Sequence, residues 1–342
     1  MSVYACFHRL RDFLKRSCIG AIVAAFVISC APSYAAYDTK EILRAIVKIR
    51  STIPNNARTA PLLGTEREGT GVVIDSNGLI LTISYLILEA TDVEITGTDG
   101  KKSKAHVIGY DQETGFGLLR ATHSLGVSPM RLGLSSEIKE NAPLLVASHG
   151  GREAVLGVRV ISRQEYVGYW EYLLEDAIFT TPPHPNYGGS ALIDREGRLV
   201  GIGSLYSVLQ LTGIGSIPSN MFVPIDRLKP ILNDMIIKGR STDRPRPWLG
   251  IFSQETYGRI IITRVSAGGP AEEAGLGQGD IILKVDDHVV SGLADFYRKV
   301  WALGSAGVGV PISVLQGTRI NHIIVRSSSL DRFLKLNPRD DS

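Results

Sequence analysis

Short apolar runs, each interrupted by glycine, asparagine or aspartate, fill the chain from Gly71 to Pro230. They include "GVVID", "LILTI", "PLLVASH" and "LVGIGSL". Many short strands at near-regular spacing, with turn residues between them, indicate a mainly β fold of the barrel or sandwich type. Upstream, residues 38–49 have the pattern of a short amphipathic helix or an entering strand, and residues 226–237 return to helical periodicity.

A charged segment rich in proline and arginine, "KGRSTDRPR" at 238–246, separates the β-rich region from a second unit. We therefore expect a first domain over residues 37–237, a linker over 238–246, a second domain over 247–330 and a tail at 331–342. The second unit shows strands, a Gly-Pro turn, the short helix "PAEEAGL", the strand "DIILKV" and a longer helix near 292–303. This mixture predicts a small α+β domain.

The first 36 residues have the pattern of a signal peptide. A basic stretch that includes Arg9 and Arg16 precedes the apolar run Cys18–Ala31, which is too short to span a bilayer comfortably. The "SYA" triplet before Ala36 fits cleavage by signal peptidase, while "VISC" loosely resembles a lipobox that would place a lipid on Cys30. An uncleaved anchor is the third reading. All three predict an exported, periplasmic protein, either free or membrane-anchored.

The composition is that of a globular protein, since 44% of the 342 residues are hydrophobic and 21% are charged. The net charge of +3 is small and not clustered, so we expect no nucleic-acid partner. The cysteines, Cys6, Cys18 and Cys30, all lie in the leader. The folded part is therefore expected to have no disulfide and no thiolate site. No motif predicts a cofactor.

Three segments of the second unit carry a resemblance to bacterial PDZ domains, namely "WLGI" at 248–251, the stretch 262–290 and "ADFYRKVWALG" at 294–304. A PDZ groove lies between a strand edge and a helix, and it binds an extended peptide as an additional strand. By this resemblance, the backbone amides of Leu249, Gly250 and Ile251 hold the terminal carboxylate of the peptide. Gly250 suits such a loop because bare backbone can approach an anion closely.

Phe296 and Val300 lie four residues apart on the expected helix and so share one face, where they would line the same groove. Filling of the domain core is the alternative reading for both residues. Asp286, Asp287 and His288 form a polar cluster between two expected strands. Three polar residues in such a place are typical of a solvated turn, and we expect no metal site there.

With a PDZ-like unit behind it and a signal sequence in front, the region 66–230 resembles the protease domain of the HtrA (Do-like) family of periplasmic serine proteases. Three segments carry the resemblance, namely "GTGVVIDSNGLILT", "DQETGFGLLRA" and "PNYGGSALIDREGRLVGIGS". In that family they lead to the catalytic histidine, the aspartate and the nucleophile. The resemblance implies a trypsin-like double β-barrel followed by a PDZ domain. It also implies a possible homo-oligomer, since family members are commonly trimers built through the protease domain.

Alignment without gaps places Tyr85, Gly115 and Gly188 at the three catalytic positions. The chemistry needs a hydroxyl, a base that removes its proton, and a carboxylate that orients the base. A tyrosine, with a pKa of about 10, cannot act as that base at neutral pH, and glycine supplies neither carboxylate nor hydroxyl. Loss of a whole triad costs about 10⁶-fold in turnover, so we expect an inactive barrel. Tyr85 is expected to fill the former cleft and hydrogen-bond across it, with an ordinary core tyrosine as the alternative.

A rescued active site would use Ser190, two residues past the nucleophile position, with His184 in "PPHPN" or His149 in "SHGG" as its base. Ser190 would need a backbone shift to reach the nucleophile's place, and proline neighbours hold the strand of His184 extended. A loop histidine is more often solvated than catalytic. The aromatic segment "YVGYWEY" at 166–172 is interpreted as a half-buried strand, with a cleft lining or a protomer contact as alternatives.

These observations favour a pseudoprotease that binds polypeptide C-termini or extended segments through its PDZ domain. It would act in envelope protein quality control as a holder, as a scaffold, or as a modulator of an active HtrA-type protease. An active serine endopeptidase that uses Ser190 with a histidine is the alternative. The two hypotheses differ in whether casein is cut and whether a fluorophosphonate probe labels Ser190.

Overall fold

The computed structural model of the protein describes residues 39–241, 244–334 and 336. The expected signal peptide with its cleavage site and Cys30 lies outside these residues, as do residues 337–342 of the expected tail. Within the described ranges, none of the helices is both long enough and apolar enough to cross a membrane.

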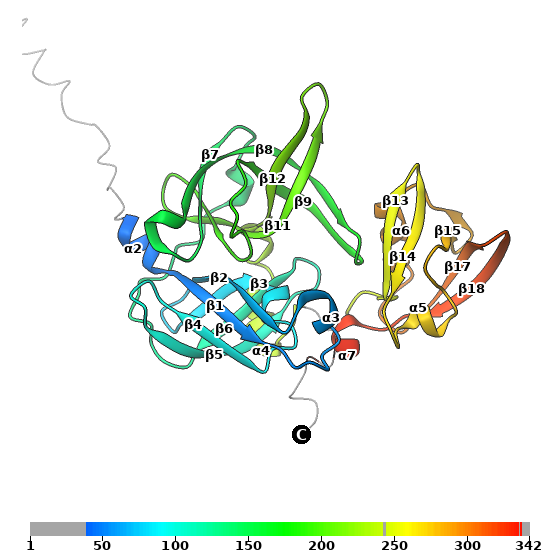
Figure 1. Ribbon diagram of the computed structural model, residues 1–342, viewed down its shortest axis with the longest axis horizontal. Coiled ribbons are helices and arrows are strands. Elements are labelled where there is room, and N and C mark those ends of the chain that lie inside the picture. The colour runs from blue at the N-terminus through cyan, green and yellow to red at the C-terminus, as the bar shows by residue number, and fades with distance from the viewer. Residues whose placement is uncertain (1–38, 242–243, 335, 337–342) are drawn as a thin grey trace, which may run out of the picture. The chain divides into compact units, whose positions relative to one another are not determined.

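The β-rich domain contains two closed antiparallel barrels, as expected for a trypsin-like double barrel (Figure 1). The first barrel closes in the order β1-β2-β3-β6-β5-β4. Its strands are β1 (Ile46–Thr52), β2 (Glu66–Val73), β3 (Leu79–Ile83), β4 (Asp92–Thr96), β5 (Lys102–Tyr110) and β6 (Phe116–Ala121). Helix α2 (Thr39–Arg44) leads directly into β1, so residues 38–49 contain both the helix and the strand that their pattern allowed.

The second barrel closes in the order β10-β11-β12-β9-β8-β7. Its strands are β7 (Pro143–Ala147), β8 (Val155–Gly168), β9 (Tyr172–Thr181), β10 (Ala191–Ile193), β11 (Leu199–Leu211) and β12 (Gly215–Pro224). Strands β8 and β9 form a long hairpin whose register ends with Gly168 opposite Tyr172. The expected strand over 166–172 is therefore wrong in its centre, because residues 169–171 form the turn of this hairpin.

The expected helix over 226–237 is divided into two pieces. The 3₁₀ turn η4 (Ile225–Arg227) is separated by Pro230 from helix α4 (Leu232–Lys238). Proline lacks an amide proton and disfavours helical backbone at the residue before it, so a continuous helix cannot form here.

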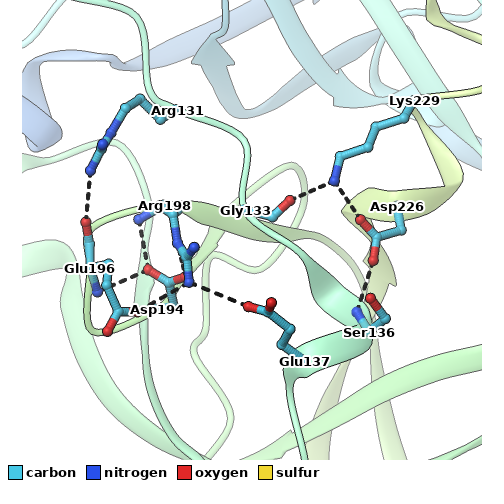
Figure 2. A network of polar contacts seen from close by, with 9 residues as sticks. All are labelled: Arg131, Gly133, Ser136, Glu137, Asp194, Glu196, Arg198, Asp226 and Lys229. Carbon is cyan, nitrogen blue, oxygen red and sulfur yellow. Dashed lines mark hydrogen bonds and ion pairs between the residues drawn. The ribbon is translucent and has the colours of Figure 1, made fainter.

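A network of polar contacts fixes the ends of these elements (Figure 2). The Asp226 carboxylate accepts hydrogen bonds from the Ser136 amide at 2.8 Å and from the Lys229 ammonium at 2.7 Å. Lys229 also donates to the carbonyl of Gly133 at 2.8 Å. Nearby, Asp194 closes the β10–β11 turn by accepting from the guanidinium of Arg198 at 2.7 Å. The hairpin that follows the Gly188 loop is thereby fixed at its far end.

The C-terminal unit is a PDZ fold built on the strand order β13-β14-β15-β17-β18, with β16 paired to β15. Its elements are β13 (Ile251–Thr256), β14 (Arg259–Val265), α5 (Pro270–Glu273), β15 (Ile281–Val285), β16 (His288–Val289), α6 (Leu293–Ala302), β17 (Gly309–Gln316) and β18 (Arg319–Arg326). Strand β13 is therefore an edge of the described sheet. The core of this unit is apolar and includes Ile262, Phe296 and Val310, all of which are fully buried.

The remaining short elements include α3 (Ala60–Leu63) and α7 (Leu330–Leu334), together with the 3₁₀ turns η1 (Ser84–Leu86), η2 (Ser135–Glu137) and η3 (Gly151–Ala154). Helix α7 lies in what we expected to be a plain tail. Its Phe333 ring packs against Trp248, with ring centroids 4.4 Å apart. One apolar core spans both barrels and joins Leu118 of β6 to Phe179 of β9 and Ile202 of β11.

Candidate functional site

Tyr85 lies on η1, the turn that follows β3, at the edge of the first barrel. Its hydroxyl donates a 2.8 Å hydrogen bond to the carbonyl of Ser204 on β11 of the second barrel. Burial raises the pKa of Tyr85, and the neighbouring Tyr187 adds to the shift. The phenol therefore stays protonated at neutral pH and donates from the first barrel to the second. The sequence predicts such a hydrogen bond across the former cleft.

The turn that holds Tyr85 is anchored from two sides. The Ser84 amide donates to the carbonyl of Gly115 at 2.7 Å, which ties η1 to the β5–β6 loop. The buried guanidinium of Arg67 donates to the carbonyls of Tyr85 at 2.8 Å and Leu88 at 3.0 Å. These bonds satisfy backbone acceptors that a short turn would otherwise leave unpaired.

Gly115, the position expected for the aspartate, has a φ of +81°. That left-handed conformation disfavours any residue with a Cβ atom. A Cβ built there would lie 3.4 Å from Ile83 and 3.8 Å from the Tyr172 ring. The carboxylate of Asp111 in the same loop accepts from Thr114 and Ser241 instead. No aspartate at position 115 would fit this backbone without strain.

Gly188, the position expected for the nucleophile, packs tightly against the Tyr85 hydroxyl. A Cβ atom built on Gly188 would lie 2.8 Å from that oxygen, closer than real Cβ contacts allow. The backbone around it is fixed by a 2.9 Å bond from the Thr70 amide to the Gly188 carbonyl and a 2.8 Å bond from the Gly189 amide to the Gly203 carbonyl. The Tyr85 hydroxyl thus occupies space that a serine side chain at 188 would need.

Ser190 is fully buried, and its hydroxyl has no hydrogen-bond partner within the described residues. The hydroxyl lies against Gly203, where an added Cβ would come within 2.4 Å of it. The structure therefore does not bring Ser190 into hydrogen-bond contact with either candidate histidine.

Both histidines have other partners. His184 Nδ1 accepts from the Asn186 amide at 3.0 Å, and its Nε2 lies 3.2 Å from the Ala154 carbonyl. His149 Nδ1 lies 3.0 Å from the Thr70 hydroxyl. Burial lowers the pKa of each histidine, so the neutral imidazole is favoured.

A cavity of about 560 Å³ adjoins Tyr85. Its lining is mainly apolar and includes Leu62, Ile83, Leu88, Trp170, Tyr172, Leu205 and Phe252. The Trp170 ring stacks on Tyr172, with centroids 5.5 Å apart. Of the alternatives for the aromatic segment 166–172, the cleft lining therefore fits Trp170 better than the half-buried strand.

The PDZ loop residues Leu249, Gly250 and Ile251 are arranged as a carboxylate site. Gly250 has a φ of +78°, which glycine adopts readily. The amides of Leu249 and Ile251 donate to the side-chain carboxylate of Glu171, with shortest distances of 2.9 Å for both. Sequence reasoning missed Glu171, because nothing in "YVGYWEY" marks one acidic residue as a ligand.

The other residues singled out in the PDZ unit are placed as follows. Phe296 and Val300 on α6 are 0% and 1% exposed and lie in one apolar cluster with the PDZ core and with Leu173 of β9, so their expected place in the groove stays a prediction. Asp286 and Asp287 have φ values of +47° and +60° and form the turn between β15 and β16. His288 Nδ1 lies 2.6 Å from the carbonyl of Asp286. In the described ranges, no three His, Cys, Asp or Glu side chains converge on a metal-sized site.

Comparison with known proteins agrees with the fold and with the order of the two domains along the chain. The Trypsin-like peptidase domain family matches residues 69–202, and the PDZ domain family matches residues 247–325. A solved structure of the HtrA-type protease AlgW with a decapeptide superposes with a TM-score of 0.51 at 21% identity and covers 87% of this chain and 98% of that one. The serine endoprotease from Yersinia pestis gives a TM-score of 0.51 at 20% identity over 89% of this chain and all of that one.

Curated relatives are similar at the sequence level. The serine protease PepD of Mycobacterium tuberculosis is 28% identical over 246 residues, covering 66% of this chain and 53% of that protein. Protease Do-like 1 of Arabidopsis thaliana chloroplasts is 28% identical over 285 residues, covering 75% and 62%. A Chlamydia muridarum protein named probable periplasmic serine endoprotease DegP-like is 24% identical, covering 72% and 51%. The chain spans about half of PepD and of the chlamydial relative.

The chain is thus a trypsin-like peptidase domain followed by a PDZ domain. Over both domains it is similar to proteins named as HtrA-type or DegP-like serine proteases.

Proposed function

We propose that this chain is an exported pseudoprotease of the HtrA family that binds polypeptide C-termini or extended segments through its PDZ domain. One observation carries the proposal: a Cβ atom built on Gly188 would lie only 2.8 Å from the Tyr85 hydroxyl oxygen. That geometry leaves no space for a nucleophile at 188 and puts a phenol where a base is needed. Without hydrolysis in the barrel domain, the PDZ groove would bind the polypeptide and hold it without cleavage.

The proposed setting is the periplasm, where the protein would hold unfolded segments or modulate an active HtrA-type protease. Support comes from the leader pattern in the sequence and from relatives named as periplasmic DegP-like proteases. A homo-oligomer built through the barrel domain is the proposed assembly, by analogy with the family.

Two measurements test the proposal on the full mature chain. Incubation with casein and with a fluorophosphonate probe should give neither cleavage nor labelling. Labelling that disappears in Ser190→Ala would instead support an endopeptidase based on Ser190, the second candidate, which the unpartnered Ser190 hydroxyl keeps open.

The binding half of the proposal is tested with decapeptides that end in Val, Leu or Phe. Peptides with a free carboxylate should bind saturably, and their C-terminal amides should not. Gly250→Val should abolish this binding, because a Cβ at position 250 is strained and would lie 3.1 Å from the Trp248 ring. Equal binding of acid and amide would contradict recognition through the loop.

A further inference from the structure

The hairpin turn at residues 169–171 makes three kinds of contact with the PDZ groove, and together they are the contacts of a bound peptide. The first is a main-chain bond. The Ser253 amide on β13 donates to the carbonyl of Tyr169 at 2.9 Å. Strand β13 uses its other edge to pair with β14, so this bond is made on the edge where an added strand would lie.

The second contact is the carboxylate. Glu171 is 6% exposed, and its two oxygens accept from the Leu249 and Ile251 amides at 2.9–3.1 Å. Successive amides on a glycine-containing loop form an anion site that binds the terminal carboxylate in PDZ recognition. Here a side-chain carboxylate occupies it. Glu171 itself has a φ of +60°, an uncommon conformation for a residue with a Cβ atom.

The third contact is with the helical wall of the groove. The Tyr297 hydroxyl on α6 donates to the Gly168 carbonyl at 2.9 Å and accepts from the Glu171 amide at 3.1 Å. Leu173 packs into the PDZ core, and Glu165 forms an ion pair with Arg298 of α6. Backbone and side chains on both sides of the turn are therefore held by PDZ residues.

We propose that residues 169–171 are an internal ligand of the PDZ groove, and that an incoming polypeptide C-terminus must displace the Glu171 carboxylate in order to bind. This inference rests on the proposed function. It defines the partner's chemistry, which is a free α-carboxylate at the end of an extended, apolar segment. An ordinary domain contact would not need two loop amides, a strand-edge amide and a groove-wall hydroxyl to converge on one three-residue turn.

A peptide that displaces the turn has a path along β13. A cavity of about 610 Å³ lies beside Tyr169 and is lined by residues of β13 and α6 together with Tyr166 of β8. Residues upstream of the peptide's C-terminus could occupy it. The internal ligand competes at a high effective concentration, of the order of millimolar for a tethered group, so its removal should raise peptide affinity by about tenfold or more.

The test compares the full chain with Glu171→Ala, and with Glu175→Ala as the matched control. Glu175 lies four residues further along the chain, on β9, but its side chain is 64% exposed and pairs with Arg227 at the surface. Glu171→Ala should bind the free-acid decapeptides at least tenfold more tightly, with no change for their amides, and Glu175→Ala should match the wild type. Glu171→Gln, which keeps the side-chain volume and an oxygen that can accept from the loop amides, guards against misfolding and should show little of this gain.

Hydrogen exchange supplies a readout that needs no peptide. The amides of Leu249 and Ile251 should exchange slowly in the wild type and at least tenfold faster in Glu171→Ala. Unchanged exchange, or unchanged affinity in a wild type that does bind, would overturn the internal ligand and leave the proposed function standing. Faster exchange without any peptide binding would support the internal ligand and reject C-terminus capture.

Discussion

At the scale of single residues, the Tyr85 hydroxyl and the absent side chain of Gly188 occupy one small volume. The hydroxyl is held there by its 2.8 Å hydrogen bond to the Ser204 carbonyl. If the hydroxyl moved away, the buried carbonyl of Ser204 would lose this hydrogen bond. A side chain placed at 188 is therefore expected to lower the free energy of unfolding, whether or not it restores any catalytic activity.

Gly188→Ser should lower the free energy of unfolding by about 1–3 kcal/mol, the usual cost of overpacking a tight site. In a Tyr85→Phe background the same change should cost clearly less, because the clashing hydroxyl is gone. Gly157→Ser is the control, since a Cβ on Gly157 meets nothing within 4 Å. Urea denaturation of the wild type, Gly188→Ser, Tyr85→Phe and the double variant gives the coupling energy. Equal costs of Gly188→Ser in both backgrounds would show that Tyr85 is not the obstacle.

At the scale of elements, the sequence predicted strands and the PDZ helix well, because apolar runs bounded by glycine and aspartate are strong local signals. Ungapped alignment also located Tyr85 and the Gly250 loop. The turn at 169–171 was missed, because Tyr169, Trp170 and Glu171 carry no turn-forming residue. Its partners are also distant, since Glu171 and Leu249 are 78 residues apart. Contacts of that separation depend on tertiary packing, which a single sequence does not encode locally.

The η4 turn depends on Asp226, whose pKa is about 2. Burial pushes that pKa upward, but the hydrogen bonds from Lys229, Ser136 and Ser135 outweigh it. A depressed pKa means that the carboxylate stabilises the fold above its unfolded pKa of about 3.8, and that this contribution is lost as the pH falls toward 2.

Asp226→Asn should therefore cost about 1 kcal/mol at pH 6, a value reduced for solvent screening at a partly exposed pair, and about half as much near pH 3. Asp234→Asn is the control, because Asp234 pairs with Lys238 at 3.6 Å on the surface of α4. Its effect should stay within a few tenths of a kcal/mol. Thermal or urea unfolding at both pH values provides the measurement. A difference between wild type and Asp226→Asn that is the same at both pH values would contradict the linkage.

At the scale of the whole molecule, the barrel domain supplies the residue that closes the PDZ groove. Glu171 comes from the β8–β9 hairpin, and the loop that receives it begins at Leu249, beyond α4. Peptide binding to the PDZ unit is then linked to the conformation of a barrel hairpin that also carries Trp170 into the cavity beside Tyr85. A change in the docking of this turn is a route by which a ligand in one domain alters the other.

This docking should depend on pH. Burial raises the pKa of Glu171 to about 7, against the opposing effect of the amides of Ile251, Leu249 and Gly250. Tyr297 is a titratable group that faces the turn from α6, and burial raises its pKa as well, so it stays neutral. Nearby, the ion pair between Glu165 and Arg298 connects β8 to α6. An acid whose pKa is raised on docking binds its proton more tightly when docked. The docked state is therefore favoured below the ordinary pKa of about 4.5 and loses that advantage as the pH rises through 7.

Peptide affinity should follow the opposite course. Between pH 5.5 and 8, the dissociation constant of a free-acid decapeptide should fall in the wild type, by at most about tenfold per pH unit below 7. The peptide's own carboxylate, with a pKa of about 3.5, stays ionised throughout. Glu171→Gln removes the titrating group and should give a nearly flat profile. Fluorescence anisotropy across the pH series measures both proteins. Parallel profiles would assign the pH dependence to other groups and would contradict a competing Glu171 carboxylate.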